Sequence, residues 1–157
     1  MKVEFWVIGK TSFNYLDEGN SIYLNRIKHY LPFEMVIIND IKNRKKLSEG
    51  QIKTKEGEVI LSKLNTSDFL ILMDERGKQR SSIQFSAYLQ TLLQHSYKRL
   101  IFIIGGAYGF SEAVYQRSNT KMSLSNMTFS HQMVRVIFLE QFYRALTIMK
   151  NEPYHHS

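Results

Sequence analysis

Four short runs of almost wholly apolar residues recur along the chain, and segments with helical spacing separate them. The runs cover residues 3–8, 33–38, 69–73 and 100–104. Strands this apolar are buried on both faces, which is typical of a parallel sheet whose connections are helices. We expect helices over residues 12–31, 52–64, 81–94, 111–117 and 130–150, and a brief fifth strand over 122–124. The sequence therefore predicts an α/β fold with a mostly parallel sheet, in one domain spanning residues 1–157.

The last predicted helix carries an apolar stripe at helical spacing, so we expect it to pack on the sheet. The stripe consists of Val134, Ile137, Phe138, Phe142, Ala145 and Met149. Ligands of parallel sheets bind beyond the carboxyl ends of the strands. The loops after Met73, Ile104 and Leu124 are therefore the candidate binding loops.

The composition narrows the function classes. Hydrophobic residues make up 43% of the chain, enough for a real core. The absence of cysteine excludes a disulfide framework and thiolate metal sites, and it fits a reducing compartment. Neither a membrane-length apolar run nor a signal cleavage pattern is present, so we expect a cytoplasmic protein without membrane contact. The formal charge of +7 favours a polyanionic partner such as nucleic acid, although a basic enzyme without one is the plainer alternative.

Two glycine-containing segments resemble nucleotide-binding motifs and do not match them. Residues 9–11 (GKT) end like a P-loop, but position 4 is Glu4 where that motif needs glycine, so a nucleoside triphosphatase is rejected. Residues 105–110 (GGAYGF) lack the G-x-G-x-x-G spacing and the acidic residue about 20 positions onward, which disfavours NAD and FAD. Three glycines in five positions still allow a ligand to approach the backbone closely.

Charged side chains supply further candidates, each with a plain alternative. Asp74 and Glu75 follow a strand and point apart, so we interpret them as a solvated turn. His131 and Arg135 lie four residues apart and could present a cationic pair, or simply an exposed helix edge. The histidine spacings fit no zinc motif, and we expect no metal. Residues 42–46 (KNRKK) form a basic segment that could contact phosphates or remain solvated surface.

Several segments, in this order and spacing, resemble the RlmH family of SPOUT-class RNA methyltransferases, and the likeness spans essentially the whole chain. Besides the first strand and residues 32–34 (PFE), they are residues 73–78 (MDERGK), 103–110 (IIGGAYGF), 123–131 (SLSNMTFSH), 134–136 (VRV), 140–145 (EQFYRA) and 151–155 (NEPYH). The chain departs from many relatives at Ala107 and Tyr108 in the glycine loop, and at Asn126, Met127 and Phe129.

The resemblance implies a SPOUT-type fold with a C-terminal trefoil knot, a homodimer, and S-adenosylmethionine as cofactor. It also implies methylation of N3 of a pseudouridine in large-subunit (23S) ribosomal RNA, on the RNA or the ribosome. The implied cofactor contacts fall at Met73 and Gly105, with Gly106 letting the adenosine approach the backbone, and at the backbone of Leu124, Ser125, Asn126, Met127, Thr128 and Phe129.

The residues suggest how such a transfer could proceed, without deciding between the possibilities. Methyl transfer from a sulfonium needs alignment and a nucleophilic nitrogen. His131 or His155 could accept the N3 proton, or Arg135 could stabilise the developing anion. Tyr154 could stack on the target base.

Other functions stay open at this point. One is a SPOUT enzyme that modifies a different RNA nucleotide. Another is a basic RNA-binding module on the same scaffold that has lost catalysis, and a more distant one is a flavodoxin-like small-molecule binder.

Overall fold

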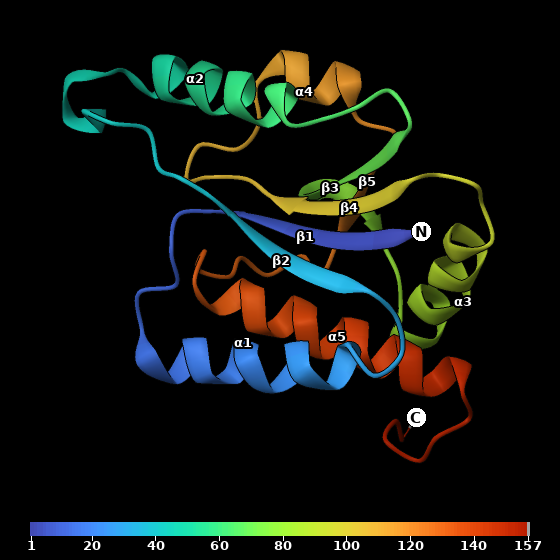
Figure 1. Ribbon diagram of the computed structural model, residues 1–157. Coiled ribbons are helices and arrows are strands. Elements are labelled where there is room, and N and C mark those ends of the chain that lie inside the picture. The colour runs from blue at the N-terminus through green and yellow to red at the C-terminus, as the bar shows by residue number, and fades with distance from the viewer. Residues whose placement is uncertain (157) are drawn as a thin grey trace.

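The apolar runs form the strands of one parallel sheet in the computed structural model, which describes residues 1–156 (Figure 1). The strands lie in the order β2-β1-β4-β3-β5, and every neighbouring pair is parallel. Their bounds are β1 (Lys2–Ile8), β2 (Phe33–Ile38), β3 (Asp68–Gln79), β4 (Arg99–Ile104) and β5 (Thr120–Ser123). The predicted α/β fold with a parallel sheet is confirmed.

Helices cover both faces of the sheet, as the apolar strands predict. On one face lie α1 (Asn14–Ile27), α3 (Ser82–Leu93) and α5 (Met133–Met149), and on the other α2 (Glu49–Ser62) and α4 (Glu112–Arg117) (Figure 1). A short 3₁₀ helix, η1 (Arg44–Lys46), precedes α2. Among residues 1–156, no helix is both long and apolar enough to cross a bilayer.

Helix α5 forms the centre of one core layer. Phe138 stacks on Phe5 of β1, with ring centroids 4.4 Å apart, and Phe142 lies 4.8 Å from Phe33 of β2. Both α5 rings are fully buried. The predicted apolar stripe therefore packs on the sheet, and this fixes the direction of α5 across it.

Strand β3 is longer than the sequence predicted, and this corrects the interpretation of residues 73–78 as a simple turn after a strand. The strand continues through a register shift, so that Met122 of β5 is the register partner of both Met73 and Lys78. A side chain at Gly77 would place its Cβ 2.4 Å from the Met122 backbone nitrogen. Glycine is required there because the two backbones pass this closely.

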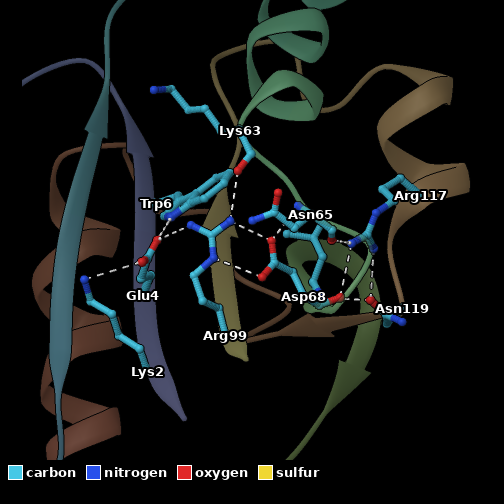
Figure 2. Close-up of polar contacts among 10 residues, drawn as sticks. Lys2, Glu4, Trp6, Lys63, Asn65, Asp68, Arg99, Arg117 and Asn119 are labelled. Atoms are coloured by element: carbon cyan, nitrogen blue, oxygen red, sulfur yellow. Dashed lines mark hydrogen bonds and ion pairs between the residues drawn. The ribbon is translucent and has the colours of Figure 1, made fainter. Parts of the chain in front are cut away.

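A polar network holds the amino ends of the strands together (Figure 2). Arg99 of β4 donates to both oxygens of Asp68 at the start of β3, at 2.9 and 2.6 Å, and to Glu4 of β1 at 3.2 Å. Glu4 also accepts from the Trp6 indole at 2.7 Å. Both carboxylates are almost fully buried, so Arg99 compensates two charges that would otherwise be costly to bury.

Candidate active site

A cavity of about 720 Å³ opens at the carboxyl ends of β3, β4 and β5. Its size is typical of small-molecule sites. Three loops supply most of its wall, as the sheet order predicts. The residues of those loops that line it are Met73, Asp74, Glu75 and Arg76, then Ile104, Gly105, Gly106, Ala107, Tyr108, Gly109 and Phe110, and then Met122, Ser123, Leu124, Ser125, Met127, Thr128 and Phe129.

The glycine loop, residues 105–109, is a tight turn with packing on both sides. Gly109 has a φ of +79° and donates a 3.1 Å backbone hydrogen bond to the carbonyl of Gly106. A Cβ at Gly105 would lie 3.1 Å from the Phe110 ring, and one at Gly106 would lie 2.6 Å from the Glu56 carboxylate. A side chain at Gly105 or Gly106 would therefore displace the Phe110 ring or the Glu56 carboxylate, whether or not a ligand is bound.

The acidic turn, expected to be solvated, instead contributes a side chain to the cavity wall. Asp74 accepts a hydrogen bond from the Tyr115 hydroxyl of α4 and another, at 3.0 Å, from the Arg76 backbone N–H. Burial, together with the adjacent carboxylate, raises the pKa of Tyr115 to about 12. Tyr115 therefore keeps its proton at neutral pH and holds Asp74 as an acceptor. The expectation of a purely solvated turn is wrong for Asp74, although Glu75 is exposed.

Residues 123–129 form an irregular loop that is fixed by its own side chains. The Ser123 hydroxyl donates to the Ser125 carbonyl at 3.0 Å, and the Ser125 hydroxyl accepts from the Met127 N–H at 3.0 Å. Asn126 points elsewhere: its side-chain oxygen accepts a hydrogen bond from Gln79, and it does not line the cavity. The other five of the six predicted loop contacts, residues 124, 125 and 127–129, lie in the cavity wall.

His131 lies at the rim of the same cavity, exposed on its outer side. Desolvation on its inner side and the nearby charges of Arg135 and Arg44 lower its pKa, in spite of a backbone contact at Gly105 that raises it. The imidazole is therefore neutral at physiological pH and has the protonation state of a proton acceptor.

Arg135 does not share the face of His131. Helix α5 begins only at Met133, so the helical spacing on which that prediction depended does not apply to residue 131. The Arg135 guanidinium is buried and donates to the carbonyls of Ile8 and Gly9, at 2.7 and 2.9 Å. It lies behind the cavity rather than in its wall.

Tyr154 and His155 follow the end of α5 and fold back against it, whereas His131 precedes the start of this helix. The Tyr154 hydroxyl donates to Glu140 at 3.1 Å, and His155 Nδ1 lies 3.1 Å from Arg144 Nη1. Glu140 and Arg144, which contact these two tail residues, form an ion pair with each other at 2.5 Å. The tail thus folds back against the middle of α5, and neither Tyr154 nor His155 lines the cavity of its own protomer.

Two features of the site had no signal in the sequence. Tyr115 and Asp74 are 41 residues apart and meet only because α4 folds over the end of β3. Glu56 of α2 is 3% exposed, lies behind the glycine loop, and pairs at 3.5 Å with Arg44 from the basic segment. Burial raises the pKa of Glu56, while Arg44 opposes that rise.

The cavity wall differs in charge from the basic protein around it. Asp74, Glu75 and Glu112 contribute three carboxylates, against the two fixed cations Lys53 and Arg76. Within the described part of the chain, no three metal-ligating side chains of the His, Cys, Asp or Glu type gather in one place. The site therefore offers a ligand backbone hydrogen-bonding groups, apolar surface and a few oriented charged side chains.

Comparison with known proteins gives consistent matches. The family described as "Predicted SPOUT methyltransferase" matches residues 1–155. Proteins named "Ribosomal RNA large subunit methyltransferase H" are similar at 58% identity in Parabacteroides distasonis and 56% in Christiangramia forsetii, each over 99% of both chains. A weaker likeness, with a TM-score of 0.43 and 13% identity over 96% of this chain and 59% of the other, is to the SpoU methyltransferase AviRb of Streptomyces viridochromogenes, solved with AdoMet.

Proposed function

The chain belongs to the SPOUT methyltransferase family, and from this premise we propose that it methylates large-subunit ribosomal RNA with S-adenosylmethionine as methyl donor. The observation that carries the proposal is full-length identity of up to 58% with proteins named for that activity. We propose further that the target is N3 of a pseudouridine, that the chain acts as a single domain, and that it works in the cytoplasm.

The residues of the cavity fit S-adenosylmethionine. Gly105, Gly106 and the loop of residues 124–129 offer backbone groups and apolar surface to a nucleoside. We assign Met73, Gly105, Gly106 and residues 124–129 to the cofactor, with Asn126 contributing through its backbone. When bound, the cofactor supplies an electrophilic methyl group on a sulfonium.

His131 is the group we propose as proton acceptor. It is neutral, lies at the cavity rim and is open to an incoming base. The target nitrogen must lose its proton before or during attack on the methyl carbon, and a neutral imidazole at this position can take that proton. Arg135 supports this arrangement by tying the start of α5 to the end of β1, at Ile8.

The position of the C-terminal tail supports a homodimer. Because Tyr154 and His155 do not line the cavity of their own protomer, a role in transfer requires that they reach the cavity of a second copy. Helix α1, which packs on α5, and the Phe13 residue that precedes it expose a surface suited to association: Phe13, Tyr15 and Ile22 are each at least 50% exposed. We propose that the tail completes the partner's site.

Co-expression of two inactive variants tests the dimer. One ends after Glu152, and the other, Ser125→Trp, has a filled cavity. If the tail acts across the interface, mixed dimers regain methyl transfer because each contains one complete site. If the tail acts within its own protomer, or not at all, the mixture stays inactive or the truncated protein is active alone.

We also propose that the chain forms the trefoil knot of its family. Residues 74–77 leave and rejoin the pairing with β5 around Met122, so β5 lies against a loop of β3 rather than beside a plain strand. Because Gly77 has no side chain, the backbone of β3 can lie this close to the backbone of Met122 in β5.

The basic segment, residues 42–46, is proposed to contact the RNA backbone. Lys42, Lys45 and Lys46 are exposed, and Lys53 of α2 continues this charge to the cavity wall. Phosphate contacts of this kind make affinity depend on salt.

Transfer of a radiolabelled methyl group tests the function. Purified protein and labelled S-adenosylmethionine are incubated with ribosomes, free ribosomal RNA or transfer RNA, and Ser125→Trp is the matched control. Label in large-subunit RNA that depends on an open cavity supports the proposal. Label only in transfer RNA favours a different RNA target, and no binding of S-adenosylmethionine favours a module without catalysis.

A further inference from the structure

The Asp74–Tyr115 pair is a fixed acceptor in the cavity wall that has no role in the proposed cofactor contacts or proton transfer. Asp74 ends the first part of β3, directly after the proposed cofactor contact Met73. Its two carboxylate oxygens are each held by one donor, the Tyr115 hydroxyl on Oδ2 and the Arg76 N–H on Oδ1. Each oxygen therefore keeps a free lone pair.

Tyr115 keeps this carboxylate in place. The ring is half-buried, it packs at 5.9 Å against Phe110, and its pKa is raised to about 12, so it donates across the whole physiological range. The guanidinium of Arg76 and the ammonium of Lys121 lie over the same ring, 5.9 and 5.6 Å from its centroid. Asp74 is thus a preorganised negative charge rather than a mobile one.

The charge of the surroundings makes this placement unusual. The chain carries a formal charge of +7, yet the cavity wall has three carboxylates and two fixed cations. A ligand that is cationic at its reacting atom is therefore attracted locally, while the surface outside favours a polyanion.

We propose, on the basis of the proposed function, that Asp74 makes the site prefer the sulfonium of S-adenosylmethionine over the neutral sulfur of its product. In the transfer the target nitrogen's electron pair forms the N–C bond, the S–C bond breaks, and its electrons remain on sulfur. The N3 proton goes to the base. The positive charge that Asp74 attracts therefore disappears on turnover, and S-adenosylhomocysteine is released more readily.

Because cofactor and product share most of their groups, a contact to a shared group can be told apart from a contact to the sulfonium. Adenine, ribose, carboxylate and α-ammonium are present in both ligands, which differ only in the methyl group on sulfur and the positive charge that it brings. A contact of Asp74 to a shared group would alter both affinities equally. A contact to the sulfonium alters their ratio.

Calorimetric titration of both ligands tests the proposal. Asp74→Asn keeps the shape and loses the charge, so we expect S-adenosylmethionine affinity to fall about tenfold, or ~1.4 kcal/mol, and that of S-adenosylhomocysteine to change less than twofold. Sinefungin, which carries an amine in place of the methylated sulfur, should follow S-adenosylmethionine. Tyr115→Phe should shift the ratio in the same direction by less. Glu58→Gln, an exposed charge change on α2 away from the cavity, should leave both affinities unchanged.

Two results would overturn the inference. Equal losses for both ligands in Asp74→Asn would assign Asp74 to a shared group, and unchanged affinities would remove it from the site. Thermal melting of each variant shows whether it is folded, and Asp74→Glu, which retains the charge, should retain most of the preference. Failure of the wild-type protein to bind S-adenosylmethionine would contradict the proposed function itself. Binding by the wild type without a changed preference in Asp74→Asn would contradict only the role of Asp74.

Discussion

Arg135 donates a 2.7 Å hydrogen bond to the carbonyl of Ile8, so the start of α5 is tied to the carboxyl end of β1. The same guanidinium also donates to Gly9 and to the Thr11 hydroxyl, at 2.9 and 3.1 Å. One buried side chain thus connects the last helix to the loop that follows the first strand, and the neighbouring Val134 of that helix lines the cavity.

Replacement of Arg135 by Met should destabilise the protein by about 2–4 kcal/mol, because two buried carbonyls lose their donors. The stability of Arg135→Lys should lie between that of Arg135→Met and that of the wild type, since lysine lacks the planar guanidinium that donates to both carbonyls. Urea denaturation measures both. A loss below about 0.5 kcal/mol for Met, comparable to an exposed Lys150→Met control, would contradict this structural role.

The pH dependence of stability should report Asp68. Burial acts to raise the pKa of this carboxyl, but hydrogen bonds from Arg99 and the Asn65 N–H outweigh it, and the pKa lies below its usual value. Its stabilisation is therefore complete above the unfolded value of about 3.9 and is lost as pH falls through the lower folded value. Asp68→Asn should lower the free energy of unfolding by about 3 kcal/mol at pH 7. As the pH is lowered, this free energy should fall less steeply in the variant than in the wild type.

Unfolding free energies at pH 7, 4 and 3 check this prediction. Glu34→Gln, which removes an exposed partner of Lys2, is the control and should leave the denaturation midpoint unchanged. If the unfolding free energy of Asp68→Asn falls with decreasing pH as steeply as that of the wild type, Asp68 is not the group responsible for the pH dependence.

Glu56 should behave in the opposite sense. Burial raises its pKa, so its contribution to stability is present below the unfolded value and is lost as pH rises through the folded one. Glu56→Gln should therefore stabilise the protein at pH 8, on the order of 1 kcal/mol, and less at pH 5. Arg44 is not left unpaired by this change, because it also lies 3.4 Å from Asp40. Equal effects at both pH values, as expected of Glu58→Gln, would argue against a buried ionised Glu56.

Glycine substitutions separate packing in the cavity wall from general backbone effects. Gly106→Ala would bring a Cβ to 2.6 Å from the Glu56 carboxylate, so either that carboxylate or the glycine loop must shift. We expect the loop to shift, because Glu56 is buried, and S-adenosylmethionine binding to weaken at least tenfold. Gly50→Ala, in the first turn of α2 with open space around it, should stabilise the protein by about 0.4–1 kcal/mol and leave binding intact. Unchanged cofactor affinity in Gly106→Ala would remove the loop from the site.

The sequence predicts the sheet well because four of the five strands contain apolar runs, and β1 and β4 are almost wholly buried. It does not predict the second half of β3, since residues 74–79 are polar and pair with β5 only through the close passage at Gly77. The cavity loops follow from the parallel order of the strands. The Asp74–Tyr115 contact could not be predicted from the sequence, because it depends on how α4 lies over β3 rather than on any local pattern.

The same distinction applies to the charged candidates. His131 reaches the cavity rim from a loop, whereas Arg135, four residues later, is buried inside α5, because the helix begins between them at Met133. The sequence singles out Tyr154 and His155, but it does not show that they fold back onto Glu140 and Arg144 of α5, outside the cavity wall.

The most direct measurement of the central claim is the position of the methyl group on RNA. Ribosomes from cells that lack this protein are incubated with the purified protein and S-adenosylmethionine, and the RNA is digested and analysed by mass spectrometry. We predict one new N3-methylpseudouridine in large-subunit ribosomal RNA, and none with Ser125→Trp. A protein that binds S-adenosylmethionine but leaves large-subunit RNA unmethylated, or that methylates another nucleotide, would contradict the account.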